Sequence, residues 1–484
     1  MGKHSSNHPN RRDLFRIMGA GTAALLTPAF SPGARGASGD PPKAEETLCW
    51  TAVNEMIPER TEAWQKAMAF WRDAKFGMFI HWGPVSQASV EISWPIMVPN
   101  SRSPISENKY VNLYKTFNPV QYDPDEWVEL AKDAGQRYMV MVTKHHDGFC
   151  MFDSSFTDYK ITNTPYKKDI VRMLADSCHR QNMALGFYYS PPDMHHPGYR
   201  DTTKPVSQTW HAQPTRPEWP VYLDYMGLQL RELLCHYGPG LVVWFDGLDH
   251  QEKYDGYCFA RMIREFSPGT LVNNRIGTPG DFDTPEQWVP KRIPVKGGML
   301  QGVNPGLGSS LPGGIPAPGE FKPWETCMTI NNTWAYNKND LNYKSATHLI
   351  RSLVDVASKG GNFLLNVGPT PQGTIQPEFR DRLRGIGKWM KVNGESIYGT
   401  TYGPLQDLSF GRTTAKGSTV YLQVFDWPTS GRLEVPGLQA RIRRVKVLAN
   451  GQPLKFKQST QGVTIEGPQQ APDPSVSVLE LTTS

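Results

Sequence analysis

The sequence lacks the features that would assign its 484 residues to a disulfide-rich, membrane or nucleic-acid-binding class. Its six cysteines include no C-x-x-C pair, which argues against a disulfide scaffold and a structural zinc site. No apolar run reaches the roughly 18 to 20 residues that cross a bilayer as a helix. With 38% hydrophobic and 20% charged residues, the composition is that of a globular protein with one large and one smaller domain.

Net positive charge is scarce outside the first 36 residues. That segment holds five basic residues and one acidic residue, and so contributes four of the five net positive charges of the chain. The remainder is nearly neutral and shows no basic excess of the kind that binds a polyanion. We therefore expect no nucleic-acid partner.

The same segment has the order of features found in an export signal. Arg11 and Arg12 precede an apolar stretch at 17–30, and a run of small residues follows at 33–38. This order predicts a signal peptide of twin-arginine type over residues 1–36. The apolar part is too short for a permanent anchor, so we expect a periplasmic or secreted protein with no integral membrane segment after signal removal.

Between residues 60 and 400, short apolar runs alternate with amphipathic helical stretches. One such helix is predicted to start at Asp123 and Pro124, as N-cap and first helical residue, and to stop at Gly135. The alternation indicates βα units around a parallel sheet. We predict an α/β fold with a (β/α)8-like TIM barrel over residues 37–400, and keep a doubly wound sheet as the alternative. Seven strands are expected, at 77–80, 138–143, 183–189, 241–245, 270–273, 326–330 and 362–367.

Two later segments break this alternation. Residues 276–323 are rich in Gly and Pro and show little periodicity, which is typical of a functional or disordered loop. After residue 400 the helical pattern gives way to short strand-like runs, with a hairpin turn signal at Asn450-Gly451. We predict a C-terminal β-sandwich domain over residues 401–484.

Polar side chains follow five of the expected strands directly. They occur at His81, at 144–149, at 188–190, at 244–247 and at 273–275. The active site of such a barrel forms at the carboxyl ends of its strands. Five polar strand ends in succession therefore predict a polar ligand pocket at that end of the barrel.

Asp246 is the strongest candidate for chemistry in this pocket. It ends the apolar run 241–245, and Trp244 shares its face of the strand. A carboxylate beside an aromatic ring suits a sugar, although a structural aspartate bonded to backbone amides is the alternative. His145 and His146 could serve as metal ligands, but neighbours on a strand point to opposite faces and no matching carboxylate set is nearby. We expect neutral histidines that contact hydroxyl groups, and no metal or other cofactor.

These motifs, taken in order, resemble the retaining α-L-fucosidases of glycoside hydrolase family 29. The resemblance spans about residues 60–400, and the ordered set carries more weight than any single motif. The family's architecture, a (β/α)8-like domain followed by a β-sandwich, agrees with the organisation predicted above. The motifs lie at 76–83, 143–149, 244–247, 273–275, 284–287, 324–331, 361–369 and 393–399.

The resemblance implies a retaining exo-acting α-L-fucosidase that removes terminal α-L-fucose from glycans. Asp246 would be the nucleophile, and Glu286 the acid/base, with Glu325 as its rival because Trp324 beside it could raise its pKa. Tyr188 is the alternative to Tyr189, because the strand phase is not fixed by sequence. The implied substrate-binding residues are His81, Glu91, Trp94, His145, His146, Tyr189, Trp244, Arg275 and Trp334.

One departure from the family pattern is Ala335, which stands where the family's Trp-Gly-Tyr has glycine. Two other functions are kept open at this point. The chain could be a non-catalytic glycan-binding protein on the same fold, or a glycoside hydrolase for another sugar. The expected partner in each case is a glycan, and for the first function it is a fucosylated oligosaccharide or glycoconjugate.

Overall fold

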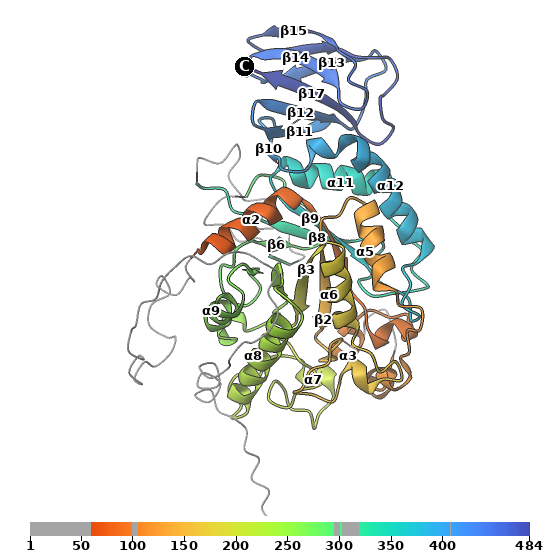
Figure 1. Ribbon diagram of the computed structural model, residues 1–484, viewed down its shortest axis with the longest axis vertical. Coiled ribbons are helices and arrows are strands. Elements are labelled where there is room, and N and C mark those ends of the chain that lie inside the picture. Colours follow the sequence, from red (N-terminus) through yellow and green to blue (C-terminus); the bar gives the residue numbers. More distant parts are fainter. Residues whose placement is uncertain (1–59, 99–104, 295–300, 303–318, 407) are drawn as a thin grey trace, which may run out of the picture.

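The computed structural model describes residues 60–98, 105–294, 301–302, 319–406 and 408–484. The predicted signal peptide at 1–36 lies outside the described residues, as does part of the Gly- and Pro-rich stretch at 276–323. Within the described parts, a parallel sheet with surrounding helices is followed by antiparallel sheets (Figure 1).

The seven expected strands form one parallel sheet, in the order β5-β4-β3-β2-β1-β9-β8. Most of their residues are buried, which explains why they read as continuous apolar runs rather than as alternating patterns. The strands are β1 (Phe76–Ile80), β2 (Tyr138–Lys144), β3 (Ala184–Tyr189), β4 (Val242–Phe245), β5 (Leu271–Val272), β8 (Glu325–Thr329) and β9 (Asn362–Val367).

The gap between β5 and β8, the two edges of this sheet, is closed by an irregular segment. Single parallel bridges join Asn273 to Phe282, Asp283 to Trp324, and Glu286 to Cys327. Within the segment, β6 (Thr284–Pro285) pairs with β7 (Gln301–Gly302). The strands therefore curl into a (β/α)8-like barrel, as predicted. This eighth member escapes sequence analysis because only two of its residues are regular strand, and one of them is a proline.

The helices begin where capping residues predict them. Asp123 accepts the amides of Asp125 and Glu126 at the start of α5, and Asp169 and Ser345 cap α6 and α11 in the same way. The longer helices are α2 (Glu62–Ala74), α5 (Pro124–Asp133), α6 (Ile170–Arg180), α8 (Trp219–His236), α9 (Gly256–Phe266), α11 (Ala346–Ser358) and α12 (Pro377–Asn393). Short helices are α3 (Trp94–Met97), α4 (Glu107–Val111) and α7 (Val206–Thr209), and 3-10 turns lie at Pro84–Ala88, Leu113–Thr116, Ile161–Asn163, Gln251–Lys253 and Gly394–Ser396.

The C-terminal strands form two antiparallel sheets that share one apolar core, so the predicted β-sandwich is confirmed. The predicted turn at Asn450-Gly451 is present, with Gly451 at φ +71°, and closes a short hairpin in which Lys446 pairs antiparallel with Pro453, although the strands on either side belong to different sheets. One sheet has the order β10-β11-β12-β17-β14 and the other β13-β16-β15. Their bounds are β10 (Thr401–Tyr402), β11 (Gly411–Lys416), β12 (Thr419–Val424), β13 (Arg432–Pro436), β14 (Ile442–Val447), β15 (Lys455–Ser459), β16 (Gly462–Glu466) and β17 (Ser477–Thr483).

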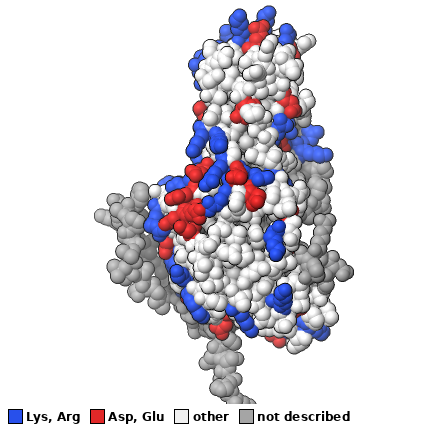
Figure 2. Space-filling view, turned by 90° about the vertical axis from the view of Figure 1, so that its right-hand side faces the viewer, with Lys and Arg blue, Asp and Glu red and all other residues white. Residues whose placement is uncertain are grey.

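Helices α11 and α12 lie between the parallel sheet and the sandwich (Figure 1). Trp389 on α12 donates its indole N–H to the carbonyl of Val476 at 2.9 Å, and the Tyr421 hydroxyl donates to Glu395 at 2.8 Å. On the face drawn in Figure 2, basic and acidic side chains are interspersed, most densely near this junction. None of the described helices is long and apolar enough to cross a membrane.

Cys178 and Cys235 both lie in helix-like sequence patterns, which predict two small buried residues. Cys178 on α6 is buried, as its helical pattern indicated. Cys235 on α8 is exposed, although its pattern indicated burial as well. Burial on a helix depends on which face the neighbouring elements cover, which the local pattern does not give.

The close packing of α12 on α5 leads to a stability prediction. A Cβ at Gly387 would lie 1.8 Å from the carbonyl oxygen of Asp133, whereas one at Gly385 meets only the Cβ of Ala346, at 3.0 Å. Gly387→Ala should therefore destabilise the fold by about 1 to 3 kcal/mol, because the backbone of α5 must shift. Gly385→Ala is the matched control, since alanine favours a helix by about 1 kcal/mol over glycine. Thermal unfolding should show a clear loss for the first variant only, and equal midpoints would contradict the packing.

Candidate active site

A cavity of about 290 Å³ opens where the carboxyl ends of the barrel strands meet. This size is close to the lower end of the range for ligand pockets. A larger cavity, of about 740 Å³, lies between α2 and α9 and contains none of the predicted site residues. The smaller cavity is lined by Phe79, His81, Trp94, His145, His146, Tyr188, Trp244, Asp246, Gly247, Leu248, Gln251, Arg275, Glu286, Cys327 and Trp334.

Arg275 joins two carboxyl groups in this cavity. Its Nη1 lies 2.8 Å from Asp246 Oδ1 and 3.0 Å from Glu286 Oε2. The rest of the guanidinium is fixed by Thr284, whose hydroxyl and carbonyl accept from Nε at 2.8 Å and from Nη2 at 2.9 Å. Asp246 follows β4, Arg275 follows β5 and Glu286 follows β6, so three successive strand ends supply the group.

The spacing of the two carboxyl groups follows from this shared nitrogen. Because both contacts end on the same atom, the two oxygens are no further apart than the sum of 2.8 Å and 3.0 Å. Retaining glycosidases place their carboxyl groups about 5 to 5.5 Å apart, and inverting enzymes about 6.5 to 9.5 Å. The arrangement therefore suits a double displacement with retention.

The surroundings of Asp246 favour its ionised form. Burial raises the pKa of this carboxyl, but the positive charge of Arg275 and the hydroxyl of Tyr188, which donates at 2.8 Å, outweigh burial and bring the pKa below its usual value. The side chain is 15% exposed, so it still reaches the cavity. A carboxylate that stays ionised and faces the ligand is suited to act as a nucleophile.

The surroundings of Glu286 have the opposite effect. Burial raises the pKa of Glu286, and the negative charge of Asp246 adds to that rise, while Arg275 opposes it. The net pKa is above the usual value for a glutamate, and the side chain is 19% exposed. Two neighbouring carboxyl groups whose pKa values are moved in opposite directions divide into an acid and a nucleophile.

Three histidines line the cavity, and burial lowers the pKa of each, to about 4 for His81 and His146. All three are therefore neutral near pH 7. The Nδ1 of His81 donates to Asn366 Oδ1 at 2.7 Å, since the amide nitrogen of Asn366 is engaged with the Trp334 carbonyl. This leaves Nε2 of His81 free of a proton and able to accept a hydroxyl hydrogen.

Two serines fix the proton positions of the other two rings. Ser190 donates to the Pro192 carbonyl, so its hydroxyl oxygen accepts from His146 Nδ1 at 2.6 Å, and His146 Nε2 is an acceptor. Ser93 accepts the amide of Asp147, and among the described residues the acceptor in reach of its own hydroxyl hydrogen is His145 Nδ1, at 2.6 Å. Ser93 therefore donates to Nδ1, and Nε2 of the neutral His145 ring carries a hydrogen. The cavity thus offers both donors and acceptors to a polyhydroxyl ligand.

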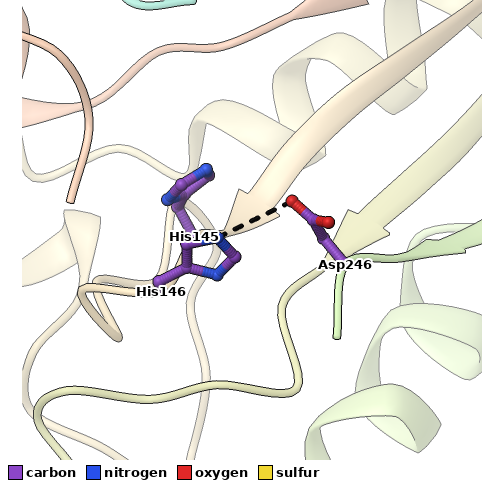
Figure 3. Close-up of side chains that lie close together, drawn as sticks. All are labelled: His145, His146 and Asp246. Atoms are coloured by element: carbon purple, nitrogen blue, oxygen red, sulfur yellow. Dashed lines mark ion pairs between the residues drawn. The ribbon is translucent and has the colours of Figure 1, made fainter. Parts of the chain in front are cut away.

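Figure 3 shows that His145 and His146 both face Asp246, with His146 Nε2 at 3.7 Å from Asp246 Oδ2. The expectation that the two rings point to opposite faces is wrong, because both residues follow the end of β2 and strand alternation does not apply there. Their donor atoms lie close enough to hold a metal ion. Each oxygen of Asp246 also accepts a hydrogen bond, one from Arg275 and one from Tyr188.

Aromatic rings form the apolar side of the cavity. Trp244 stacks on Tyr188 with ring centres 5.7 Å apart, and the guanidinium of Arg275 lies 4.7 Å from the centre of the Trp244 ring. Trp94 and Trp334 line other parts of the wall, as predicted from the sequence resemblance. Such faces cover the apolar surface of a sugar ring.

Two of the implied substrate-binding residues, Tyr189 and Glu91, lie outside the cavity. Tyr189 points away from the cavity and donates to Gln229 at 2.8 Å, so Tyr188 is the pocket tyrosine. Glu91 supports the wall from behind, accepting the amides of Trp334 at 2.8 Å and Ala335 at 3.1 Å. Ala335 itself is outside the left-handed region, so the missing glycine imposes no strain.

Glu325, the rival acid/base, does not line the cavity. It starts β8 and is 1% exposed inside the barrel, where it accepts hydrogen bonds from Trp244 and Trp71. Burial raises its pKa to about 7, against the effect of these hydrogen bonds. The indole of Trp324, which the sequence suggested as the cause, donates to the Lys359 carbonyl. The geometry therefore pairs Glu286, and not Glu325, with Asp246.

The structure adds lining residues that sequence analysis missed. Phe79 lies on β1, two residues before His81. Because side chains two residues apart on a strand share a face, the sequence could have placed Phe79 beside His81. Leu248 and Gln251 follow Asp246 in a loop without a motif. Ser190, which sets the tautomer of His146, belongs to the polar strand end at 188–190, whereas Ser93 carries no signal in a single sequence because its partner His145 is distant in the chain.

A parallel barrel that holds two carboxyl groups of opposed pKa in a small aromatic cavity defines a retaining glycoside hydrolase. Comparison with known proteins gives the family. Residues 51–395 match the family model described as alpha-L-fucosidase, and residues 407–482 match the alpha-L-fucosidase C-terminal domain. The chain is 30% identical over 432 residues to the plasma alpha-L-fucosidase of Homo sapiens, covering 83% of this chain and 86% of that protein.

Similar solved structures support the same family. Alpha-L-fucosidase isoenzyme 1 from Paenibacillus thiaminolyticus is 35% identical, with a TM-score of 0.75 over 87% of this chain and 100% of that one. A GH29 alpha-L-fucosidase from Bacteroides thetaiotaomicron, trapped as a covalent intermediate with 2-fluoro-fucosyl fluoride, is 26% identical, with a TM-score of 0.71 over 87% and 96% of the two chains. The chain belongs to the alpha-L-fucosidase family of glycoside hydrolases.

The two adjacent tyrosines of β3 provide a matched test of this site. Tyr188→Phe removes a hydrogen bond to the charged form of Asp246, so the pKa of that carboxyl should rise. We expect kcat/KM to fall roughly 10-fold or more, with the acidic limb of the pH profile moved to higher pH, because a hydrogen bond to a charged group contributes about 1.5 to 3 kcal/mol. Tyr189→Phe should leave the position of that limb unchanged. Identical pH profiles for the two variants would contradict the assignment of Tyr188 as the hydrogen-bond donor to Asp246.

Proposed function

We propose that this retaining exo-α-L-fucosidase uses Asp246 as its nucleophile and Glu286 as its acid/base. The observation that carries the proposal is the single Arg275 nitrogen that contacts both carboxyl groups. Family membership supplies the substrate class, terminal α-L-fucose on a glycan. The small cavity supports attack at a chain end, because it has room for about one sugar residue.

In the first step Asp246 attacks the anomeric carbon of the bound fucose. Glu286 gives its proton to the glycosidic oxygen as the bond to the leaving group breaks. The product is a covalent fucosyl-enzyme ester on Asp246 and a free aglycone. The negative charge of ionised Asp246 also stabilises the positive charge that develops on the sugar ring.

In the second step Glu286, now ionised, takes a proton from water. That water attacks the same anomeric carbon, and the ester bond to Asp246 breaks. Two inversions give overall retention, and both carboxyl groups return to their starting protonation. The raised pKa of Glu286 supports this exchange of roles, since the group must hold a proton in one step and accept it in the next.

The pocket side chains support fucose as the sugar. The neutral histidines present both donors and acceptors to ring hydroxyls, while the aromatic wall offers an apolar surface to the C5 methyl group. The two carboxyl groups favour a hydrolase over a glycan-binding protein on the same fold, because binding alone requires neither their proximity nor their opposed pKa values.

The pH dependence should be bell-shaped. Asp246 must be ionised, so kcat/KM should fall as the pH drops through its lowered pKa. Glu286 must be protonated, so kcat/KM should also fall as the pH rises through its raised pKa. Glu286→Gln should remove the alkaline limb on an activated aryl fucoside. An alkaline limb that persists unchanged in this variant would contradict the role of Glu286.

Fucosides with good and with poor leaving groups distinguish the proposed roles of Glu286 and Asp246. Glu286→Gln should lose about 10²- to 10⁴-fold on fucosides with poor leaving groups and much less on those with good ones, since good leaving groups need no proton. Azide should restore turnover of the activated substrates and give fucosyl azide with retained configuration. For Asp246→Ala we expect loss of nearly all turnover and no retained product with azide. Equal losses of Glu286→Gln across all leaving groups would count against the assignment.

We further propose export through the twin-arginine-type signal at residues 1–36, followed by a catalytic domain at 37–400 and a sandwich domain at 401–484. The paired Arg11 and Arg12 ahead of a short apolar stretch support the signal. Replacing both arginines with lysine should retain the unprocessed protein in the cytoplasm of the producing cell. Normal processing of that variant would contradict the twin-arginine route.

A further inference from the structure

Glu325 is a buried carboxyl group that the proposed chemistry does not use. It is held inside the barrel by three neutral donors from three different elements. The indole of Trp244 on β4 donates to Oε1 at 3.0 Å, the indole of Trp71 on α2 donates to Oε2 at 3.3 Å, and the hydroxyl of Tyr138 on β2 also donates to Oε2. Burying a carboxyl group among apolar side chains is costly, even when it is hydrogen-bonded.

The contact with Trp244 connects Glu325 to the active site. The ring of Trp244 stacks on Tyr188, with an angle of 15° between the planes, and carries the guanidinium of Arg275 at 4.7 Å. Tyr188 and Arg275 are the two groups that donate to Asp246. A rotation of the Trp244 ring would therefore displace both donors to the proposed nucleophile together.

The indole nitrogen is the only polar atom of Trp244 that can resist such a rotation, since the remainder of the ring makes nondirectional contacts. Its partner Oε1 lies on β8, two residues from the cavity-lining Cys327. The hydrogen bond thus links the ring to a strand that does not pair with β4, where the ring originates.

We propose that Glu325 is a positioning residue, which fixes the plane of Trp244 and through it the Tyr188 and Arg275 donors to Asp246. The proposal rests on the assignment of Asp246 and Glu286 given above. Glu325 takes no part in proton transfer to the substrate. The raised pKa of Glu325 follows from its burial and marks no acid/base role.

A pair of substitutions at Glu325 tests this role. Glu325→Leu removes every acceptor, and should lower kcat about 10- to 100-fold with a smaller change in KM, because small misplacements affect the transition state more than substrate binding. Glu325→Gln keeps one acceptor oxygen for the Trp244 indole, and should restore kcat to within about 10-fold of the wild type. A proton donor at this position would not be replaced by glutamine.

Activity measured on a series of fucosides with good and poor leaving groups distinguishes a positioning role of Glu325 from acid/base catalysis. Both Glu325 variants should lose the same factor on good and poor leaving groups, and azide should rescue neither of them. A loss confined to poor leaving groups, with azide rescue, would overturn the proposal. If Glu325→Leu does not fold, the same series on Glu325→Gln decides between the two roles.

A double-mutant cycle locates the contact through which Glu325 acts. Trp244→Phe keeps a smaller aromatic ring but removes the indole N–H, so Glu325→Leu should cost little further kcat in that background. Additive losses would overturn the proposal. Trp71→Phe is the control, since it removes a donor to Glu325 outside the cavity and should reduce thermal stability while kcat stays close to wild type. Failure of azide rescue in Glu286→Gln would instead count against the proposed function and leave the cycle interpretable.

Discussion

The contact on which the site depends is that of one guanidinium with two carboxyl groups. Arg275 brings one positive charge, and Asp246 and Glu286 would together bring two negative charges to a place largely closed to water. One cation offsets only one of them, so one carboxyl group is driven to hold a proton. Tyr188 donates to Asp246 and no equivalent donor is found at Glu286 among the described residues, so the proton belongs on Glu286. The opposed pKa shifts of Asp246 and Glu286 thus arise from their partners and not from the residue types.

The irregular part of the barrel makes this contact geometrically feasible. Asp246, Arg275 and Glu286 follow β4, β5 and β6, and Thr284 on β6 fixes the guanidinium that follows β5. The segment that closes the barrel also carries the proposed acid/base. In a regular eighth strand, the alternation between the two faces would decide the direction of each side chain. Glu286 instead forms an isolated bridge with Cys327, and its carboxyl group turns toward Arg275.

Sequence analysis recovered the barrel because buried parallel strands are short apolar runs between capped helices. It placed Asp246 at the cavity because a residue that ends such a run lies at the carboxyl end of a strand. It failed where the answer depends on contacts between distant segments. The choice between Tyr188 and Tyr189 needs the phase of β3, which a register shift near Lys144 in the neighbouring strand obscures. His145 and His146 share a face because β2 has already ended, and the end of a strand is poorly defined in sequence. Glu325 was misjudged through its neighbour Trp324, although its position at the first residue of β8 places it at the end of the barrel opposite the pocket.

The central claim is that Asp246 forms a covalent bond with the anomeric carbon of fucose. The most direct measurement is to incubate the enzyme with 2-fluoro-fucosyl fluoride, digest it, and identify the labelled residue by mass spectrometry. The account predicts one fluorofucosyl group per chain, attached to Asp246. A label on Glu286, on Glu325 or on any other residue would contradict it.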